Sequence, residues 1–385
     1  MLGALVLCMT LGAASAQARM DADRLADGQN EHVERALAAM TPYERVCQLF
    51  IVKPESIISA RHVTQAGTAT RRAMEKYPVG GFIYFSGNIQ SEKQIRTMID
   101  TVQEIGAQRH GVGLFIGVDE EGGTITRVAQ KLKTTRFDTM REIGARADAP
   151  EAYEMGVTLA RELTALGFNI DFAPVADVLI APENSEIGDR SFGSDAQIAA
   201  KMVAAQTQGL LDGGIAACVK HFPGMGSARS NSHLGTAIST RTLDELREVE
   251  FLPFLSGIEA GARLVMVSHG TFTAVDPDVP ASLSRKVVTE LLRGELGFDG
   301  LIITDAMRMQ AISDHYASGA AAVRAIEAGV DLLLMPADAP AAIEGLYRAV
   351  EEGRISQERI DESVRRILTY KQTLGLLRDT EGEKE

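Results

Sequence analysis

Hydrophobic runs rich in β-branched residues recur along the chain, and most of them end abruptly in a polar side chain. The clearest is Leu301–Asp305, where four residues without charge are closed by a single carboxylate. Continuous apolar runs of this length are typical of parallel strands that are buried on both faces. The pattern predicts eight strands, at Val46–Val52, Gly81–Phe85, Gly113–Asp119, Ile170–Val178, Ala217–Phe222, Leu264–His269, Leu301–Asp305 and Asp331–Met335.

Amphipathic segments with helical spacing separate most of these runs, for example Ser91–Gly106, Asp195–Gly213 and Arg285–Leu296. A closing helix is predicted from about Ser356, a favourable N-cap residue, to Leu374. Eight strands alternating with helices predict an α/β protein whose single domain is a (β/α)8 TIM-type barrel. A doubly wound sheet is the structural alternative. That fold usually has a glycine-rich phosphate loop after an early strand, and neither GxGxxG nor GxxxxGK[ST] is present.

The segments outside the predicted barrel are short. Residues 1–18 are small and apolar and end in Ala14–Ala18, which resembles a signal peptide with its cleavage site. The alternative is a wrongly assigned start, with Met20 as the true first residue. We expect residues 19–40 to form a polar leader with a short helix, residues 41–376 the barrel domain and residues 377–385 a charged tail. With a cleaved leader the protein would be periplasmic or extracellular, and otherwise cytoplasmic.

Composition narrows the classes of partner and cofactor. The formal net charge of −13 argues against nucleic acid or an anionic membrane as the partner. No run after the leader is long and apolar enough to span a bilayer. Cys8 lies in the leader, and Cys47 and Cys218 lie in predicted core strands, so a disulfide framework is not expected. No Cys/His cluster has zinc spacing, and the sequence therefore implies no metal and no cofactor.

Polar side chains gather where the predicted strands end, which is where barrel enzymes form their active sites. Asp119 is at the end of the third predicted strand, Lys220 and His221 are near the end of the fifth, His269 is at the end of the sixth and Asp305 at the end of the seventh. The loops after the fourth and fifth strands contribute Arg190 and His233. Each residue has an ordinary explanation of its own: Asp305 could cap a helix, and His233 could simply be solvated in its loop. The prediction depends on all of them converging on one mouth.

A mouth with carboxylates, a lysine, an arginine and imidazoles suits a neutral, polyhydroxylated ligand, because these groups form charge-assisted hydrogen bonds to hydroxyls. Glycoside cleavage needs a carboxylate to stabilise an oxocarbenium-like centre and a proton donor for the leaving oxygen. Asp305 suits the first role, and His233 could supply the second.

The order and spacing of six motifs resemble those of glycoside hydrolase family 3, in its β-N-acetylglucosaminidase branch, from about Thr41 to Gly375. The motifs are Val118–Gly123, Asp171–Val178, Gly188–Gly193, Lys220–Gly226, Asn231–His233 and Ile303–Met307. The resemblance implies a retaining mechanism, with Asp305 as the nucleophile and His233 as the acid/base. It also implies that the sugar is bound by Asp119, Arg127, Arg190, Lys220, His221, His269 and Met307.

Three positions depart from the family pattern. Asn231 stands where the branch has an aspartate, Met225 replaces a second histidine, and Thr124 replaces an arginine. Asn231 matters most, since an aspartate beside an imidazole fixes its tautomer and stabilises the imidazolium, whereas an amide adds no negative charge. A slow hydrolase, an enzyme that recruits another carboxylate and a glycan-binding protein without turnover all remain open.

The sequence therefore predicts an exo-acting hydrolase that removes terminal β-linked N-acetylglucosamine from peptidoglycan fragments or chitin-type oligosaccharides and acts as a monomer. The alternatives are a non-catalytic or weakly active glycan binder, and a β-glucosidase or broad β-hexosaminidase.

Overall fold

The computed structural model describes residues 31–58, 60–231 and 236–378. Eight parallel strands of this part form the central sheet, in the order β10-β8-β5-β4-β3-β2-β1-β11. A parallel bridge between Ile303 and Leu332 joins the two ends of that order and closes a barrel. The strands are β1 (Phe50–Val52), β2 (Gly81–Ile83), β3 (Phe115–Val118), β4 (Ile170–Asp171), β5 (Ala216–Phe222), β8 (Leu264–Val267), β10 (Leu301–Thr304) and β11 (Leu333–Leu334).

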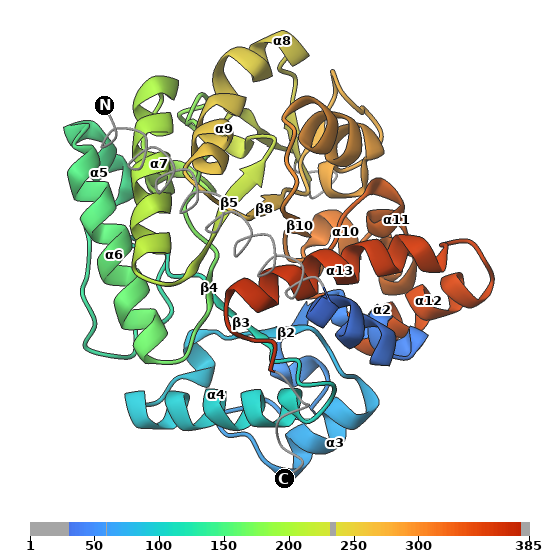
Figure 1. Cartoon of the computed structure of the whole chain (residues 1–385). Helices are drawn as coiled ribbons and strands as arrows, with labels where there is room; N and C mark the ends of the chain where they lie inside the picture. Colours follow the sequence, from blue (N-terminus) through green and yellow to red (C-terminus); the bar gives the residue numbers. More distant parts are fainter. Residues whose placement is uncertain (1–30, 59, 232–235, 379–385) are drawn as a thin grey trace, which may run out of the picture.

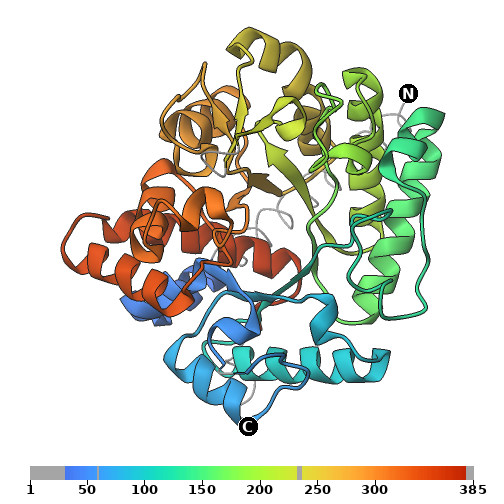
Figure 2. The same ribbon diagram turned by 180° about the vertical axis from the view of Figure 1, so that it is seen from behind.

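Helices surround the barrel, as Figure 1 and the reverse view in Figure 2 show, so the predicted (β/α)8 architecture is confirmed. The α-helices are α2 (Pro42–Gln48), α3 (Thr68–Lys76), α4 (Glu92–Ala107), α5 (Met140–Arg146), α6 (Ala149–Ala165), α7 (Ala196–Asp212), α8 (Leu243–Glu245), α9 (Phe251–Glu259), α10 (Gln310–Ser313), α11 (Ser318–Ala328), α12 (Ala339–Glu351) and α13 (Gln357–Thr373). Two π-helical segments are η5 (Leu246–Glu250) and η7 (Lys286–Glu295). Short 3-10 turns are η1 (Pro54–Ser56), η2 (Ser86–Asn88), η3 (Gly188–Arg190), η4 (Met225–Ser227) and η6 (Ala281–Leu283).

Side-chain caps set the starts of the long helices where the sequence predicts them. The Ser91 hydroxyl accepts a hydrogen bond from the Gln94 amide at the start of α4, and the Asp195 carboxylate accepts two amides at the start of α7. Ser356 caps α13 in the same way. These bonds satisfy amides that the first helical turn leaves without a partner.

Helices α6 and α7 pack closely because glycines face each other across their contact. A Cβ at Gly156 would lie 2.5 Å from the Gln206 carbonyl oxygen, and one at Gly209 would lie 2.1 Å from the Tyr153 carbonyl oxygen. Any larger residue at either position would push the two backbones apart.

The predicted strand Val46–Val52 is wrong over its first half, because residues 42–48 form α2 and β1 begins only at Phe50. Thr41 and Glu44 form a capping box: the Thr41 hydroxyl accepts from the Glu44 amide, and the Glu44 carboxylate accepts from the Thr41 amide at 2.8 Å. This T-x-x-E signature can be read from the sequence. Cys47 is therefore buried in a helix, and both it and Cys218 are free thiols.

A small sheet beside the barrel was not predicted. It consists of β6 (Arg229–Asn231), β7 (Thr236–Ser239) and β9 (Thr271–Phe272), with β6 antiparallel and β9 parallel to β7. Its sequence is rich in serine and asparagine and lacks the alternation that marks a strand. The predicted acid/base residue, His233, lies between β6 and β7, outside the described residues.

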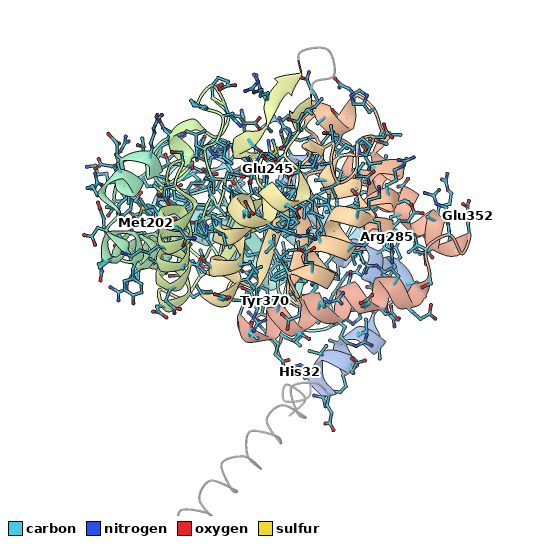
Figure 3. The ribbon with its side chains drawn as sticks, turned by 90° about the horizontal axis from the view of Figure 1, so that it is seen from above. His32, Met202, Glu245, Arg285, Glu352 and Tyr370 are labelled. Atoms are coloured by element: carbon cyan, nitrogen blue, oxygen red, sulfur yellow. The ribbon has the colours of Figure 1, made fainter. Side chains whose placement is uncertain are left out.

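The described chain begins with a helical segment, residues 31–39, that lies next to α13. His32 is labelled there in Figure 3 below Tyr370 of α13, and Glu34 forms an ion pair with Arg365 of the same helix. Within the described residues, no helix combines the length and apolar character needed to cross a membrane.

Lys371 of α13 is fully buried against the barrel. Its Nζ donates to Gln48 Oε1 at 2.9 Å and lies 5.0 Å from the centroid of the Phe115 ring. No carboxylate in the described part of the chain forms an ion pair with it. Burial lowers the pKa of Lys371 to about 7, because the charged ammonium is poorly solvated there.

We expect Lys371→Met to stabilise the protein by roughly 1–3 kcal/mol at pH 7. The folded-state pKa lies below the unfolded value, so the unfolded chain binds more protons between pH 7 and about 10.4, and wild-type stability should rise with pH across that window. Lys371→Met has no ammonium at this position, so its stability should rise less with pH across the same window. Urea unfolding at several pH values measures it, with exposed Lys201→Met on α7 as control. Equal pH slopes for wild type and Lys371→Met would contradict the expectation.

Candidate active site

A cavity of about 530 Å³ opens at the carboxyl-terminal end of the barrel strands. Residues that follow six different strands line it, which is how this fold assembles its active sites. Six of the nine predicted site residues are brought together there: Asp119, Arg127, Arg190, Lys220, His221 and Asp305. The structure thus supports one common mouth for most of the predicted set.

A β-bulge in β5 lets two consecutive residues reach this cavity. Side chains of neighbouring residues in a regular strand point to opposite faces. The register of β5 against β8 shifts between Lys220 and Phe222, so His221 has no partner on β8. Both Lys220 and His221 consequently line the cavity.

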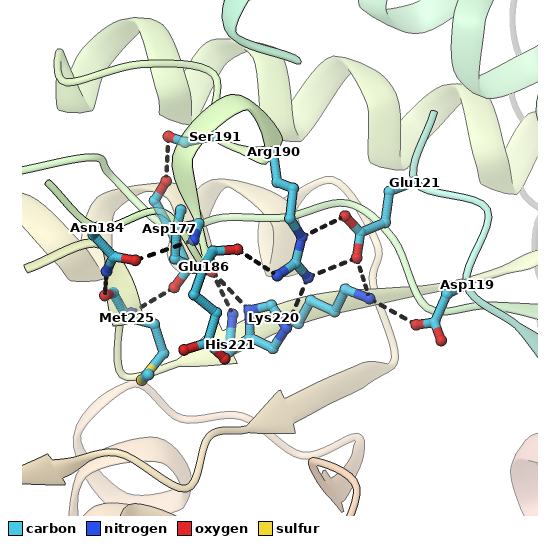
Figure 4. A network of polar contacts seen from close by, with 11 residues as sticks. Asp119, Glu121, Asp177, Asn184, Glu186, Arg190, Ser191, Lys220, His221 and Met225 are labelled. Atoms are coloured by element: carbon cyan, nitrogen blue, oxygen red, sulfur yellow. Dashed lines mark hydrogen bonds and ion pairs between the residues drawn. The ribbon is translucent and has the colours of Figure 1, made fainter. Parts of the chain in front are cut away.

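A buried ion-pair network holds the polar groups of the mouth, as Figure 4 shows. Lys220 Nζ donates to Asp119 Oδ1 at 2.9 Å and lies 2.7 Å from Glu121 Oε1. Arg190 donates two hydrogen bonds to the same Glu121 carboxylate, both at 2.8 Å. Two carboxylates and two cations therefore balance each other, and we call these four residues the neutral network.

The charges of this network support one another. Burial alone would lower the pKa of Lys220, but Asp119 and Glu121 outweigh it and raise that pKa above its ordinary value. Burial would likewise raise the pKa of Glu121, but Lys220 and Arg190 hold it well below its usual range. Lys220 and Glu121 therefore stay charged at neutral pH, and their ion pairs hold the side chains in place before any ligand arrives.

The tautomer of His221 follows from its two neighbours. Arg190 can only donate, and its Nη2 lies 3.3 Å from His221 Nε2, so Nε2 is the acceptor. Nδ1 then carries the proton and donates to Asp177 Oδ2 at 2.7 Å. The other oxygen of Asp177 accepts the Met225 amide at 2.5 Å. Asp177 therefore connects His221 to η4, the turn that leads into β6.

Asp305 is the first residue after β10 and lines the cavity. Its amide donates to the Val267 carbonyl at 2.8 Å, and its Oδ1 accepts the Ala306 amide at 2.6 Å. Burial opposes ionisation, but the imidazoles of His221 and His269, the Ala306 amide and Lys220 together lower the pKa of Asp305. The Asp305 carboxylate is therefore ionised and forms no ion pair with the described residues. It is thus available to bond to an electron-poor carbon.

Two predicted residues, His269 and Met307, lie outside the cavity lining. His269 is buried outside the cavity lining, with Nδ1 2.7 Å from the Ser282 hydroxyl, and it acts on Asp305 through the pKa effect described above. Met307 is buried as well, and its amide donates to the Leu334 carbonyl. His233 falls outside the described residues.

The sequence places Glu121 and Asp177 at strand ends, but it assigned neither of them a role in the site. Side chains two apart in an extended segment share a face, so Asp119 and Glu121 point together into the mouth while Glu120 points away. The Glu120 carboxylate accepts the amides of Arg127, Val128 and Ala129 and so shapes the loop after β3. The same alternation, applied to the sequence, would have identified Glu121.

Among the residues that the structure describes, no group of three or more His, Cys, Asp or Glu side chains is arranged to hold a metal ion.

Known proteins that are similar to this chain in sequence include two that are named as beta-hexosaminidases. Beta-hexosaminidase LpqI of Mycobacterium tuberculosis is 32% identical over 342 residues, which cover 87% of this chain and 84% of the relative. Beta-hexosaminidase A of Pseudoalteromonas piscicida is 31% identical over 326 residues, or 78% of this chain and 54% of the relative. The chain thus spans only about half the length of that second relative.

Solved structures agree in fold. A glycoside hydrolase family 3 β-N-acetylglucosaminidase from Paenibacillus sp. str. FPU-7 superposes with a TM-score of 0.82 at 38% identity, covering 88% of this chain and 64% of that one. The family profile described as the glycosyl hydrolase family 3 N terminal domain matches residues 43–370. The chain therefore belongs to glycosyl hydrolase family 3.

Proposed function

We propose that the protein is a retaining, exo-acting β-N-acetylglucosaminidase that acts on peptidoglycan fragments or chitin-type oligosaccharides. The observation that carries the proposal is Asp305, an ionised carboxylate with no ion pair in the described residues, in a cavity that also contains the neutral network. The printed names of the relatives, beta-hexosaminidase and β-N-acetylglucosaminidase, support the same activity.

In the proposed first step, an Asp305 oxygen attacks the anomeric carbon and forms a covalent ester as the glycosidic C–O bond breaks. His233 protonates the departing oxygen. In the second step, the neutral imidazole takes a proton from water, whose oxygen attacks the anomeric carbon and releases Asp305 as a carboxylate. The sugar leaves with the configuration it had in the substrate.

The neutral network suits the hydroxyls of an uncharged terminal sugar. Asp119 is the member whose carboxylate is partly exposed, at 19%, and it can accept from a hydroxyl, while Lys220 and Arg190 can donate. Because these groups are already fixed by each other, binding the sugar requires little further ordering.

A second candidate function, glycan binding with little or no turnover, is favoured by one specific residue. Asn231 precedes the proposed acid/base by two positions and cannot supply the negative charge that an aspartate would. A plain β-glucosidase or a broad hexosaminidase is a further alternative for the same cavity.

We also propose that the protein acts as a monomer and is exported. Six of the predicted site residues of a single chain line the one cavity. The small, apolar residues 1–18 support export.

A panel of aryl β-glycosides tests the substrate. We expect release from the N-acetylglucosaminide and little from the glucoside. A fluorinated glycoside, which slows the second step, should trap a covalent adduct that peptide mapping assigns to Asp305, and Asp305→Asn should reduce turnover by at least about 10³. Turnover of only the plain glucoside would refute the substrate claim, and label on another residue would refute the assigned nucleophile.

Asn231→Asp tests whether the acid/base is impaired. If His233 lacks a charged neighbour, the aspartate should raise kcat by about 10² on substrates with a poor leaving group, because such substrates depend on proton donation. The gain should vanish in a variant that also carries His233→Ala. If the native protein and Asn231→Asp are both inert yet bind the sugar in calorimetry, the glycan-binding function is favoured.

Asp177→Asn tests the tautomer of His221. An amide can donate to Nδ1, which would move the ring proton to Nε2, where it meets the Arg190 donor. We expect kcat/KM to fall by about 10² through this loss of alignment. Asp189→Asn, an exposed carboxylate on the same loop, is the matched control. Equal kinetics for the two variants would mean that Asp177 has no positioning role.

A further inference from the structure

A second cavity, of about 410 Å³, lies at the amino-terminal end of the barrel and shares no lining residue with the candidate active site. Its walls come from η7, the end of α11, the segment between α12 and α13, and α13 itself. Figure 3 labels Arg285 on the helical segment next to α13. Arg293, which also lines the cavity, donates to the Phe298 carbonyl ahead of β10 at 2.8 Å and forms an ion pair with Asp331 ahead of β11. The cavity is therefore separate from the mouth that contains Asp305.

Arginines dominate the lining of this cavity. Five of its lining residues are arginines and only two are carboxylates: Arg285, Arg293, Arg354, Arg359 and Arg366 against Glu327 and Glu362. Asp331, buried behind the lining, adds a third carboxylate. Five guanidinium groups and three carboxylates leave an excess of two positive charges, in a chain whose net charge is −13. We call the five arginines the arginine cluster.

The buried carboxylate of Asp331 is shared by two members of the arginine cluster. Its Oδ1 accepts the Ser363 hydroxyl at 2.7 Å and Arg366 Nη1 at 3.3 Å. Its Oδ2 accepts the Ile302 amide at 3.0 Å and Arg293 Nη2. Each oxygen therefore already has two donors, and its single negative charge compensates at most one of the two arginines.

Arg359 is held mainly by uncharged acceptors. Its Nη1 donates to the Ser363 hydroxyl and its Nη2 to the Val330 carbonyl, both at 2.7 Å. The Glu362 carboxylate lies 3.8 Å from Nη1 and is half exposed, so it compensates this charge weakly. Burial and the neighbouring Arg366 lower the pKa of Arg359 despite the nearby carboxylates. Because a guanidinium still keeps its proton at neutral pH, its charge is left incompletely compensated.

The rim of the cavity adds two exposed arginines. Arg285 forms no hydrogen bond or ion pair with any other described residue. Arg354 has only Glu327, at 3.4 Å, and both of these side chains are about half exposed. Neither arginine is fixed by the fold, so both can turn toward a ligand. Ser356, the N-cap residue of α13, lines the cavity beside them, and the positive end of that helix dipole adds to the local field.

We propose that the arginine cluster binds a phosphate group. A phosphate monoester carries about 1.5 to 2 negative charges at pH 7, which matches the excess of two positive charges, whereas a single carboxylate would neutralise only half of it. Guanidinium groups form paired hydrogen bonds to phosphate oxygens. The volume of the cavity also leaves room for the group that carries the phosphate, so the ligand is either inorganic phosphate or a phosphate ester. This site goes beyond the proposed function and does not depend on glycoside cleavage.

Calorimetric titration of the full chain tests the proposal with three probes: inorganic phosphate, pyrophosphate and glucose 6-phosphate. We expect saturable binding of at least one of them at about pH 7, with one ligand per chain. The probe with the lowest Kd distinguishes a free ion from an ester. Sodium chloride at the same ionic strength should give no saturable heat. No saturable binding of any probe up to about 10 mM, or an equal response to chloride, would overturn the proposal.

Arg285→Gln/Arg354→Gln should raise the Kd at least about tenfold, because it removes two charged donors and with them the excess of positive charge. Both side chains are exposed, so the fold should be retained, and thermal melting without ligand verifies this. Arg161→Gln/Lys201→Gln removes two exposed cations from α6 and α7 and is the matched control, whose Kd should not change. Unchanged binding in the first double variant would overturn the proposal.

Lys53→Gln distinguishes this cavity from the candidate active site. Lys53 lines the cavity at the mouth of the barrel, where an anion would also meet cations. We expect the Kd for the phosphate probe to be unchanged in this variant. A loss of binding in Lys53→Gln, with normal binding in Arg285→Gln/Arg354→Gln, would place the phosphate at the mouth and overturn the proposal. Since the measurement is binding, the result is the same whether or not the protein cleaves glycosides.

Discussion

The candidate site depends on one buried cation. The Lys220 side chain is only 2% exposed, and an ammonium in such a place is tolerated only if counter-charges surround it. Asp119 and Glu121 supply them, and Glu121 in turn aligns Arg190 through two hydrogen bonds. Removing any member would leave a buried charge uncompensated, so the four side chains hold a single arrangement. The rigidity of the site follows from this electrostatic requirement.

The backbone of β5 makes that arrangement possible. The bulge after Lys220 turns His221 into the same cavity, where Arg190 and Asp177 determine its tautomer. Asp177 also accepts the Met225 amide, so the sugar-binding side of the mouth is joined to the segment that leads to β6 and β7. A local irregularity of one strand thereby connects the neutral network with the region expected to deliver the proton.

Much of this could be predicted from the sequence, and the exceptions have physical causes. The positions of seven strands follow from continuous apolar runs, but their lengths depend on hydrogen bonding to neighbours, so β4 is reduced to Ile170–Asp171. Val46–Gln48 is as apolar as a strand, and only the capping box of Thr41 and Glu44 reveals the helix. Glu121 could have been found by alternation, whereas the bulge at His221 leaves no local signal. The small sheet of β6, β7 and β9 arises from tertiary pairing alone.

The division of charge within the cavity explains why Asp305 is suited to react while the other acids are not. Asp119 and Glu121 are neutralised by Lys220 and Arg190, so they contribute hydrogen bonds and little net field. Asp305 has only imidazoles, an amide and a more distant ammonium to lower its pKa, and none of them forms an ion pair with it among the described residues. Its negative charge is therefore still available when positive charge develops on a bound sugar.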